Sequence, residues 1–202
     1  MRKQFQFTWW KYLIAILIPI ILWCSVFDIL AQPKKNQQLS ILYVGSDLDT
    51  DSLRQQIVNT LPSLTDQSIK EISVDAVSPQ NMVSLSVLTA RTFEYDILIF
   101  QESSILPNMG QNVFWSLPDD LMSHFSGISP YREDTEAGSL PYGFLLCDGK
   151  TANSFSACYS GTETCYLFLS PKSENLDTLN QNGKKGDDAA LRIAQYLLEI
   201  TP

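Results

Sequence analysis

The chain has 202 residues, of which 45% are hydrophobic, and a formal net charge of -8 at pH 7. This hydrophobic content excludes wholesale disorder, because disordered chains lack the apolar surface that offsets the entropy lost on folding. The negative charge argues against nucleic acid as a partner, since binding phosphates requires a basic patch. It also argues against extensive docking on anionic lipid.

The first element is an apolar run, YLIAILIPIILWCSV at residues 12–26, which continues to residue 30 as FDIL. Its length of about 19 residues is close to the ~20 that an α-helix needs to cross the hydrocarbon core of a bilayer. Three basic residues precede it, and Trp9 and Trp10 stand where aromatic side chains meet lipid headgroups. We therefore expect a retained single-pass membrane anchor over 12–30. Residues 1–11 would be cytoplasmic and the remainder extracytoplasmic.

Two alternatives to a retained anchor stay open. A cleaved signal peptide has a shorter apolar core and a small-residue cleavage site, for which Ile29-Leu30-Ala31 is a poor match because Ile29 is large. A lipoprotein is disfavoured because Cys24 follows the bulky Trp23. Residues 31–38 (AQPKKNQQ) are polar and short, which is typical of a linker to a domain over 39–202.

The first half of this domain predicts alternating strands and helices. Short apolar runs predict three strands, at residues 39–44, 69–77 and 95–101. The third has a continuous apolar centre, which indicates burial on both faces. Amphipathic patterns predict helices between them, at residues 49–61, where Pro62 is the expected stop, and at 79–91. This order predicts a mainly parallel sheet with right-handed crossovers in a three-layer α/β domain.

The second half predicts a β-meander and a final helix. Residues 114–125 are expected to form a short helix and 126–140 an exposed loop. Turn signals separate three strand-like runs that predict the meander, at residues 142–147, 154–159 and 164–170. A polar loop over 175–186 then leads to DDAALRIAQYLLE, a predicted helix that Asp187 or Asp188 caps.

The sharpest local feature is VGSDLDTD, residues 44–51, directly after the first strand. In parallel α/β sheets the loops beyond the carboxyl ends of the strands form the ligand crevice. We therefore expect five side chains at this edge to orient a small ligand or a partner loop: Ser46, Asp47, Asp49, Glu102 and Ser103. The alternative is ordinary capping, in which such side chains accept hydrogen bonds from the first N–H groups of a helix.

Three of the four cysteines follow the predicted anchor. Cys158 and Cys165 bracket YSGTET, and a hairpin turning there would oppose them within disulfide reach. We predict a disulfide between these two, with free buried thiols as the alternative. No zinc site is expected, because the chain has no close cysteine pair and His124 is its only histidine.

Enzyme motifs are weak or absent. An EF-hand beginning at Asp47 would require a glycine and a glutamate where the chain has Ser52 and Val58. A magnesium-dependent, haloacid-dehalogenase-like phosphatase would use Asp47 and Asp49, but Asp51 stands where that family has Thr or Val. Motifs of serine and zinc hydrolases, P-loops and dinucleotide sites are missing. We expect no catalytic residue, metal or cofactor, with the phosphatase as the enzyme alternative.

Three stretches carry a family resemblance: ILYVGSDLD with its helix, YDILIFQES, and CYLFLSPKSENL followed by the final helix. Through them, residues 39–200 resemble one lobe of an extracellular solute-binding protein, and the whole is similar to membrane-anchored accessory proteins of bacterial sugar transporters. The resemblance implies transporter subunits as partners and a sugar as the candidate ligand. Solute-binding receptors close two lobes on their ligand, whereas this domain has the length of one. We therefore expect a non-enzymatic accessory or binding domain, with a structural or sensory ectodomain as the alternative.

Overall fold

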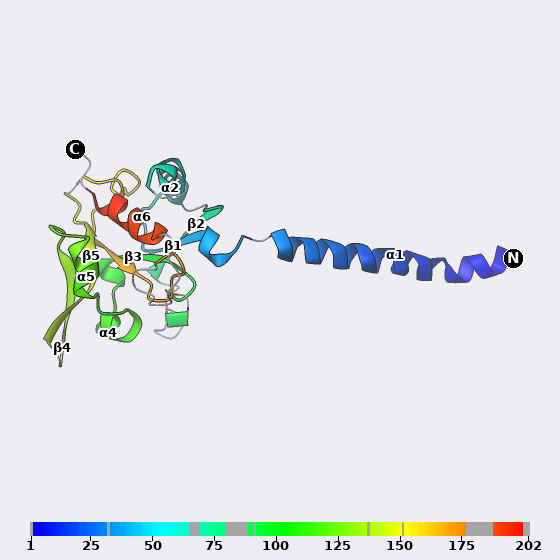
Figure 1. The fold of residues 1–202 in the computed structure, drawn as a ribbon, viewed down its shortest axis with the longest axis horizontal. Helices are drawn as coiled ribbons and strands as arrows, with labels where there is room; N and C mark the ends of the chain where they lie inside the picture. Colours follow the sequence, from blue (N-terminus) through cyan, green and yellow to red (C-terminus); the bar gives the residue numbers. More distant parts are fainter. Residues whose placement is uncertain are drawn as a thin grey trace. The chain divides into compact units, whose positions relative to one another are not determined.

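The computed structural model describes residues 2–31, 33–64, 69–79, 89–90, 92–136, 138–150, 152–176 and 188–199. The chain forms two compact units, Met1–Lys34 and Lys35–Pro202. The first contains the helix α1 (Arg2–Ala31), and the second is an α/β domain (Figure 1). Each unit is described separately below.

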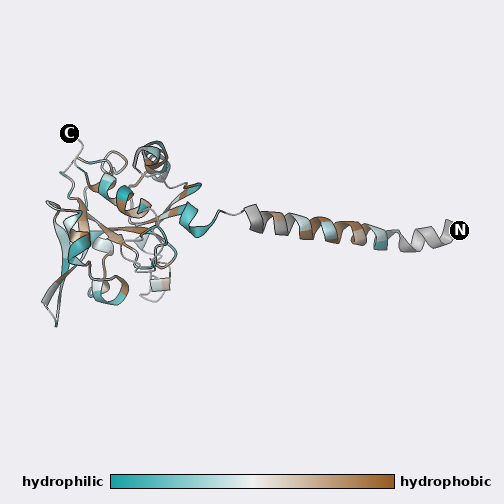
Figure 2. Ribbon diagram, in the orientation of Figure 1, coloured by the Kyte–Doolittle hydropathy of each residue, from teal (hydrophilic) through white to brown (hydrophobic). Residues whose placement is uncertain are grey.

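Helix α1 runs for 30 residues with Pro19 inside it. The centre of the helix is apolar (Figure 2), and the side chains at 9–23 are all exposed. Crossing a bilayer requires about 20 predominantly apolar residues in one helix. Among the residues that the structure describes, no helix is long and apolar enough to do so. The span expected over 12–30 is therefore not found in this part of the chain.

A six-stranded sheet in the order β2-β1-β3-β6-β5-β4 forms the centre of the domain. Its first three strands pair in parallel, β1 with both β2 and β3, as the strand–helix pattern predicted. The other three pairings, of β6 with β3, of β5 with β6 and of β4 with β5, are antiparallel. The sheet is therefore mixed rather than mainly parallel. The strands are β1 (Gln38–Val44), β2 (Glu71–Val77), β3 (Ile97–Gln101), β4 (Pro130–Thr135), β5 (Gly138–Cys147) and β6 (Cys165–Leu169).

The meander is present, but it consists of β4, β5 and β6, which differs from the predicted strands. Residues 130–135, expected in an exposed loop, form the edge strand β4. Their sequence, PYREDT, is mostly charged and polar, so it lacks the alternation of apolar residues that predicts a strand. Charged residues are nevertheless common in the exposed edge strands of sheets. Of residues 154–159, expected as a strand, 154–158 form turns and Tyr159 makes only an isolated bridge. There Asn153 N donates to Ser156 Oγ at 2.9 Å and Ser156 N donates to Asn153 Oδ1 at 2.9 Å. These bonds hold residues 153–156 in a turn and engage the N–H of Ser156, which a strand would pair with a neighbouring strand.

The helices differ from the predictions mainly near prolines. Helix α2 (Thr50–Leu64) continues past the expected stop at Pro62, which lies in its last turn. The helix expected over 114–125 is replaced by α4 (Met109–Val113) and α5 (Asp119–Ser123), because Pro118 is the extended residue before α5. Helix α6 (Ala189–Leu198) confirms the final helix. Short 3-10 helices are η1 (Lys35–Gln37) and η3 (Glu102–Ser104). Most of the helix expected at 79–91, most of the loop at 175–186, and Asp187 lie outside the described residues.

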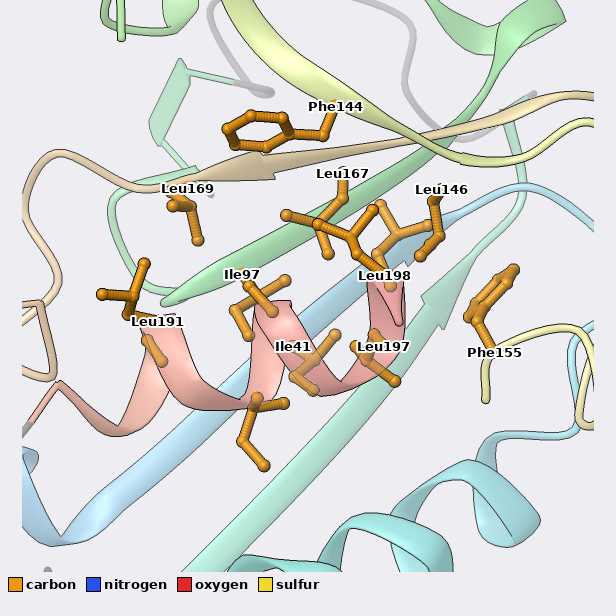
Figure 3. Packing of buried hydrophobic residues seen from close by; sticks show 14 of the residues in the cluster. Ile41, Ile97, Phe144, Leu146, Phe155, Leu167, Leu169, Leu191, Leu197 and Leu198 are labelled. Carbon is orange, nitrogen blue, oxygen red and sulfur yellow. The ribbon is translucent and has the colours of Figure 1, made fainter. Parts of the chain in front are cut away.

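Apolar side chains pack on both faces of the sheet. On one face Leu191, Leu197 and Leu198 of α6 lie over the central strands (Figure 3), in a cluster that also includes side chains of α2 and α5. On the other face Met109 and Val113 of α4 pack with alternate residues of the same strands. The domain is therefore three-layered, and β3 is buried on both faces as its sequence predicted.

Asp96, immediately before β3, connects three segments of the chain: its own, β1 and the residues that follow β6. Its carboxylate accepts hydrogen bonds from Ser40 N at 2.8 Å, Ser40 Oγ at 3.2 Å and Asn175 Nδ2 at 3.2 Å, and also from Ser173 Oγ. The residue is only 6% exposed. Burial raises the pKa of the Asp96 carboxyl, while hydrogen bonds from Ser173, Ser40 and Asn175 act in the opposite direction.

This raised pKa gives stability a defined pH dependence. The folded chain binds a proton at Asp96 more readily than the unfolded chain does, so the stability linked to that proton is fully present below the ordinary pKa of 3.8. It is lost as pH rises through the folded-state pKa. We expect Asp96→Asn to be less stable by about 1–3 kcal/mol. The amide NH2 that replaces one carboxylate oxygen would face the hydrogen-bond donors whose bonds Asp96 accepts.

The stability difference between the native protein and Asp96→Asn should shrink as pH rises above 3.8. Urea unfolding at several pH values measures this difference. The exposed residue Asp119 supplies the control, and Asp119→Asn should change the free energy of unfolding by less than about 0.5 kcal/mol. A difference that grows with pH would contradict the assignment.

Candidate functional site

The candidate site lies at the edge of the sheet where β1 and β3 end. Strand β6 begins at this edge and β5 ends there, because the register pairs Gln101 with Cys165 and Cys165 with Cys147. Loops that are distant in sequence therefore meet: residues 45–49 after β1, residues 102–104 after β3 and residues 148–164 between β5 and β6.

Gln101, the last residue of β3, holds two of these loops together. Its side chain is buried, and its Oε1 accepts a hydrogen bond from Ser46 N at 3.0 Å. Its Nε2 donates to Ser46 O at 3.1 Å and to Tyr159 Oη at 2.9 Å. Tyr43 Oη also donates to Ser46 O. Both polar atoms of the Gln101 side chain are thus bonded within the protein, and the first loop is fixed against Tyr159.

Gly45 permits this close packing. A Cβ atom at this position would lie 2.6 Å from Gln101 Cδ and 2.6 Å from Tyr43 Oη, well inside van der Waals contact. A larger residue would displace the amide that orders the loop. The glycine therefore serves the internal contact rather than the approach of a ligand.

Residues 47–49 also bond directly to residues 158–160. Leu48 and Tyr159 form an isolated antiparallel bridge. Asp49 N donates to Cys158 O at 3.0 Å, and Ser160 N donates to Asp47 O at 2.9 Å. Asp47 has a φ of 69°, a left-handed conformation that Asp adopts more readily than most residues. The loop after β1 is therefore tied to the loop before β6 along its length.

Asp49 caps helix α2. Its Oδ1 accepts a hydrogen bond from Ser52 N at 3.0 Å, and its Oδ2 accepts one from Ser52 Oγ at 2.7 Å. The hydrogen bond from the Ser52 side chain, followed by that from the Ser52 backbone, lowers the pKa of the Asp49 carboxyl. For this residue the capping alternative is confirmed.

The other four predicted site residues are exposed at the same edge, in two groups. Ser46 Oγ donates to Asp47 Oδ2 at 2.7 Å beside residues 158–160. Ser103 Oγ donates to Glu163 Oε2 at 2.6 Å, and Glu102 N donates to Thr164 O at 2.8 Å. Within the described part of the chain, no group of three or more His, Cys, Asp and Glu side chains could hold a metal ion.

An open hollow lies beside the first group. It is lined by Asp47, Leu48, Asp49, Ser52 and residues 157–160. Carboxylate and hydroxyl groups border it, whereas Tyr159 is only 7% exposed and presents little ring surface. Small-molecule sites typically enclose roughly 70–90% of a ligand. This hollow offers hydrogen-bond acceptors to a partner without enclosing it.

The predicted disulfide between Cys158 and Cys165 is not formed in the structure. Both thiols are free, as is that of Cys147. The expected hairpin does not form, because residues 158–160 bond to residues 47–49 instead. Cys158 Sγ donates to Gln56 Oε1 at 3.0 Å, and Cys165 opposes Cys147 across the sheet.

Sequence reasoning missed the residues that organise this edge, chiefly Gln101, Tyr159 and Glu163. Gln101 left a usable signal, because an amide that ends an apolar strand at the carboxyl edge of a parallel sheet needs a partner. Tyr159 and Glu163 left none, since their positions depend on the turns at 153–159.

No protein-family model, curated protein or solved structure matches this chain. The resemblance to a solute-binding lobe is thus supported by no identified relative, and it stays a prediction from sequence pattern. What the chain does must be inferred from the chemistry of its sheet edge.

Replacing Gln101 by alanine tests whether its amide organises the edge. We expect Gln101→Ala to lower the free energy of unfolding by about 2–4 kcal/mol, since buried groups lose their partners and packing. Gln55→Ala is the control, because Gln55 is exposed on α2 and should cost less than about 0.5 kcal/mol. Urea denaturation measures both. Equal effects would show that Gln101 does not hold the loops together.

Proposed function

We propose that this chain is a non-enzymatic docking domain whose acidic sheet edge binds a positively charged segment of a partner protein. The proposal rests on one observation. The carboxylates at this edge are exposed, while hydrogen bonds within the protein already hold the loops that carry them. Asp47, Glu102 and Glu163 are exposed, while the backbone beneath them is bonded to Gln101, Ser160 and Thr164. A preformed surface avoids the entropic cost of ordering loops on binding.

The open form of the hollow favours a protein partner over a small molecule. Its carboxylates face solvent, and exposed complementary charges mainly speed and orient protein association. The net charge of -8 adds a long-range attraction for a basic partner. A transporter subunit, the partner implied by the sequence resemblance, is compatible with a single lobe that docks instead of closing on a ligand.

We further propose that α1 holds the domain at a lipid membrane. A helix that is apolar on all sides is stable when other apolar groups surround it, as in a protein core or a membrane. The side chains at 9–23 are exposed, including those of Ile16, Ile20 and Trp23. Lipid would cover them, with Trp9 and Trp10 at the headgroup level.

A sugar ligand is the second candidate. Asp47, Ser52 and Ser160 border the hollow with groups that can bond sugar hydroxyls. The phosphatase alternative has weaker support, because the carboxylate oxygens of Asp49 already accept two hydrogen bonds from Ser52. Both alternatives predict responses to small molecules that a docking domain does not.

A photocrosslinker at Ser160 of the full chain, in its native membrane, tests docking directly. We expect one adduct of discrete mass, with a yield about tenfold lower in the double variant Asp47→Ala/Glu102→Ala and in high salt, because charge attraction is lost. Asp119→Ala/Asp120→Ala on α5 is the matched control and should keep the adduct.

An adduct that persists unchanged in the Asp47 and Glu102 variant would exclude this edge as the docking surface. A sugar that raises the unfolding midpoint by roughly 5–10 °C at about 100 times its dissociation constant would favour the second candidate. Magnesium-dependent hydrolysis of a phosphate ester that Asp47→Asn abolishes would establish the enzyme.

Membrane attachment is tested by placing charges in α1. Leu17→Arg/Ile20→Arg should move the full chain from the membrane pellet to the supernatant after alkaline carbonate extraction. Each arginine would place a charge among the apolar side chains that lipid covers, and an unpaired charge in apolar surroundings is strongly unfavourable. Lys11→Arg is the control and should stay in the pellet. Native protein in the supernatant would contradict the proposal.

A further inference from the structure

Two buried cysteines face each other at the base of the site. Cys147 ends β5 and Cys165 begins β6, and the register of the two antiparallel strands pairs them directly. They are 2% and 0% exposed and belong to the same apolar cluster. Opposed residues of an antiparallel pair have Cα atoms about 4.5–5.5 Å apart, within the ~4.4–6.8 Å that disulfides span.

A register shift in β5 places the two side chains on one face. Strict alternation would put Cys147 on the same face as Leu145 and opposite Leu146. The register shifts between Leu145 and Cys147, however, and both Leu146 and Cys147 pack in the cluster that contains Cys165. A bulge sets two residues of one strand against one of the other. Here it turns Cys147 toward its partner.

The third thiol of the domain is held elsewhere. Cys158 Sγ donates to Gln56 Oε1 at 3.0 Å, on the side of the loop that faces α2. The thiol of Cys165 makes a long contact of 3.8 Å with Glu163 O and also interacts with the side chain of Tyr159. A thiol forms only weak hydrogen bonds, so little is lost if these contacts break. Cys147 is therefore the partner that the geometry offers to Cys165.

We propose that Cys147 and Cys165 form a cross-strand disulfide when the chain folds in the presence of a disulfide oxidant, such as an oxidised thiol–disulfide oxidoreductase. One cysteine thiolate attacks the S–S bond of the oxidant, which forms a mixed disulfide and releases one thiolate of the oxidant. The second cysteine thiolate attacks the chain's sulfur in that mixed disulfide and releases the other. Two electrons pass to the oxidant, which leaves as a dithiol with the two protons.

The timing of this reaction follows from burial. Burial raises the pKa of the Cys165 thiol to about 12, so the folded domain contains little of the reactive thiolate. Exchange is therefore fast only while β5 and β6 are still exposed to the oxidant. The bond, once made, is shielded from reductants by the same burial.

The bond would close residues 148–164 into a loop. This loop carries Tyr159, Ser160 and Glu163, which bond to the loops after β1 and β3. A covalent closure at its base limits how far the loop can open and so keeps the edge in one conformation. The inference stands whether or not that edge binds a partner.

Peptide mapping of the full chain tests the bond. The chain, in detergent and in a Cys24→Ser background, is refolded with a mixture of reduced and oxidised glutathione, alkylated and digested without reduction. We expect a peptide linking Cys147 to Cys165, with Cys158 alkylated. The unfolding midpoint should fall by roughly 5–10 °C when the refolded protein is reduced.

Two variants separate this bond from the other pairings. Cys158→Ala should leave the linked peptide and the reductant-sensitive midpoint unchanged. Cys147→Ala should abolish both. Mapping the native sequence decides the matter even if Cys147→Ala fails to fold: alkylation of both Cys147 and Cys165, or a link from Cys165 to Cys158, would overturn the inference.

Discussion

The burial of β1 and β3 on both faces constrains the rest of this domain. Ile41 to Val44 and Ile97 to Phe100 are almost completely inaccessible to solvent. Such strands are stable only when apolar layers cover each side of the sheet, because exposing either face would cost the burial of large aliphatic side chains. Helices α2 and α6 supply side chains on one face and α4 on the other. The polar loops can then gather only at the ends of the strands.

This constraint explains what could be predicted from sequence. Strands with continuous apolar centres, such as YDILIFQ, and the strongly amphipathic final helix were located because burial leaves a direct pattern in composition. Strand β4 was missed because an edge strand with one solvated side and a charged sequence lacks that pattern. Residues 154–159 were misassigned because Asn153 and Ser156 determine the local turn through side-chain hydrogen bonds that hydrophobic periodicity does not report.

The candidate site was also predicted from sequence only in part. Parallel topology correctly placed Ser46 and Glu102 at one edge, since both follow strands that run in the same direction. It did not reveal that Gln101 bonds the loop after β1 to Tyr159, whereas the contact between Asp49 and Ser52 is the local capping that the sequence offered as the alternative. The Gln101 contact depends on residues 148–164 returning to the same edge before β6, so short-range sequence patterns do not contain it. The prediction of a bond between Cys158 and Cys165 has the same origin, because the register of β6 against β5 is a long-range property.

The insertion of β6 beside β3 also determines when the domain can fold. During synthesis Ile97–Gln101 emerges long before Cys165–Leu169, so β3 has β1 on one side and an unpaired edge on the other until the meander is complete. Pairings between distant segments slow folding, and an exposed edge of apolar residues invites aggregation in the interval. We therefore expect the nascent chain to depend on chaperone protection until its last third has emerged, and to reach the native state only after translation of the sheet is finished.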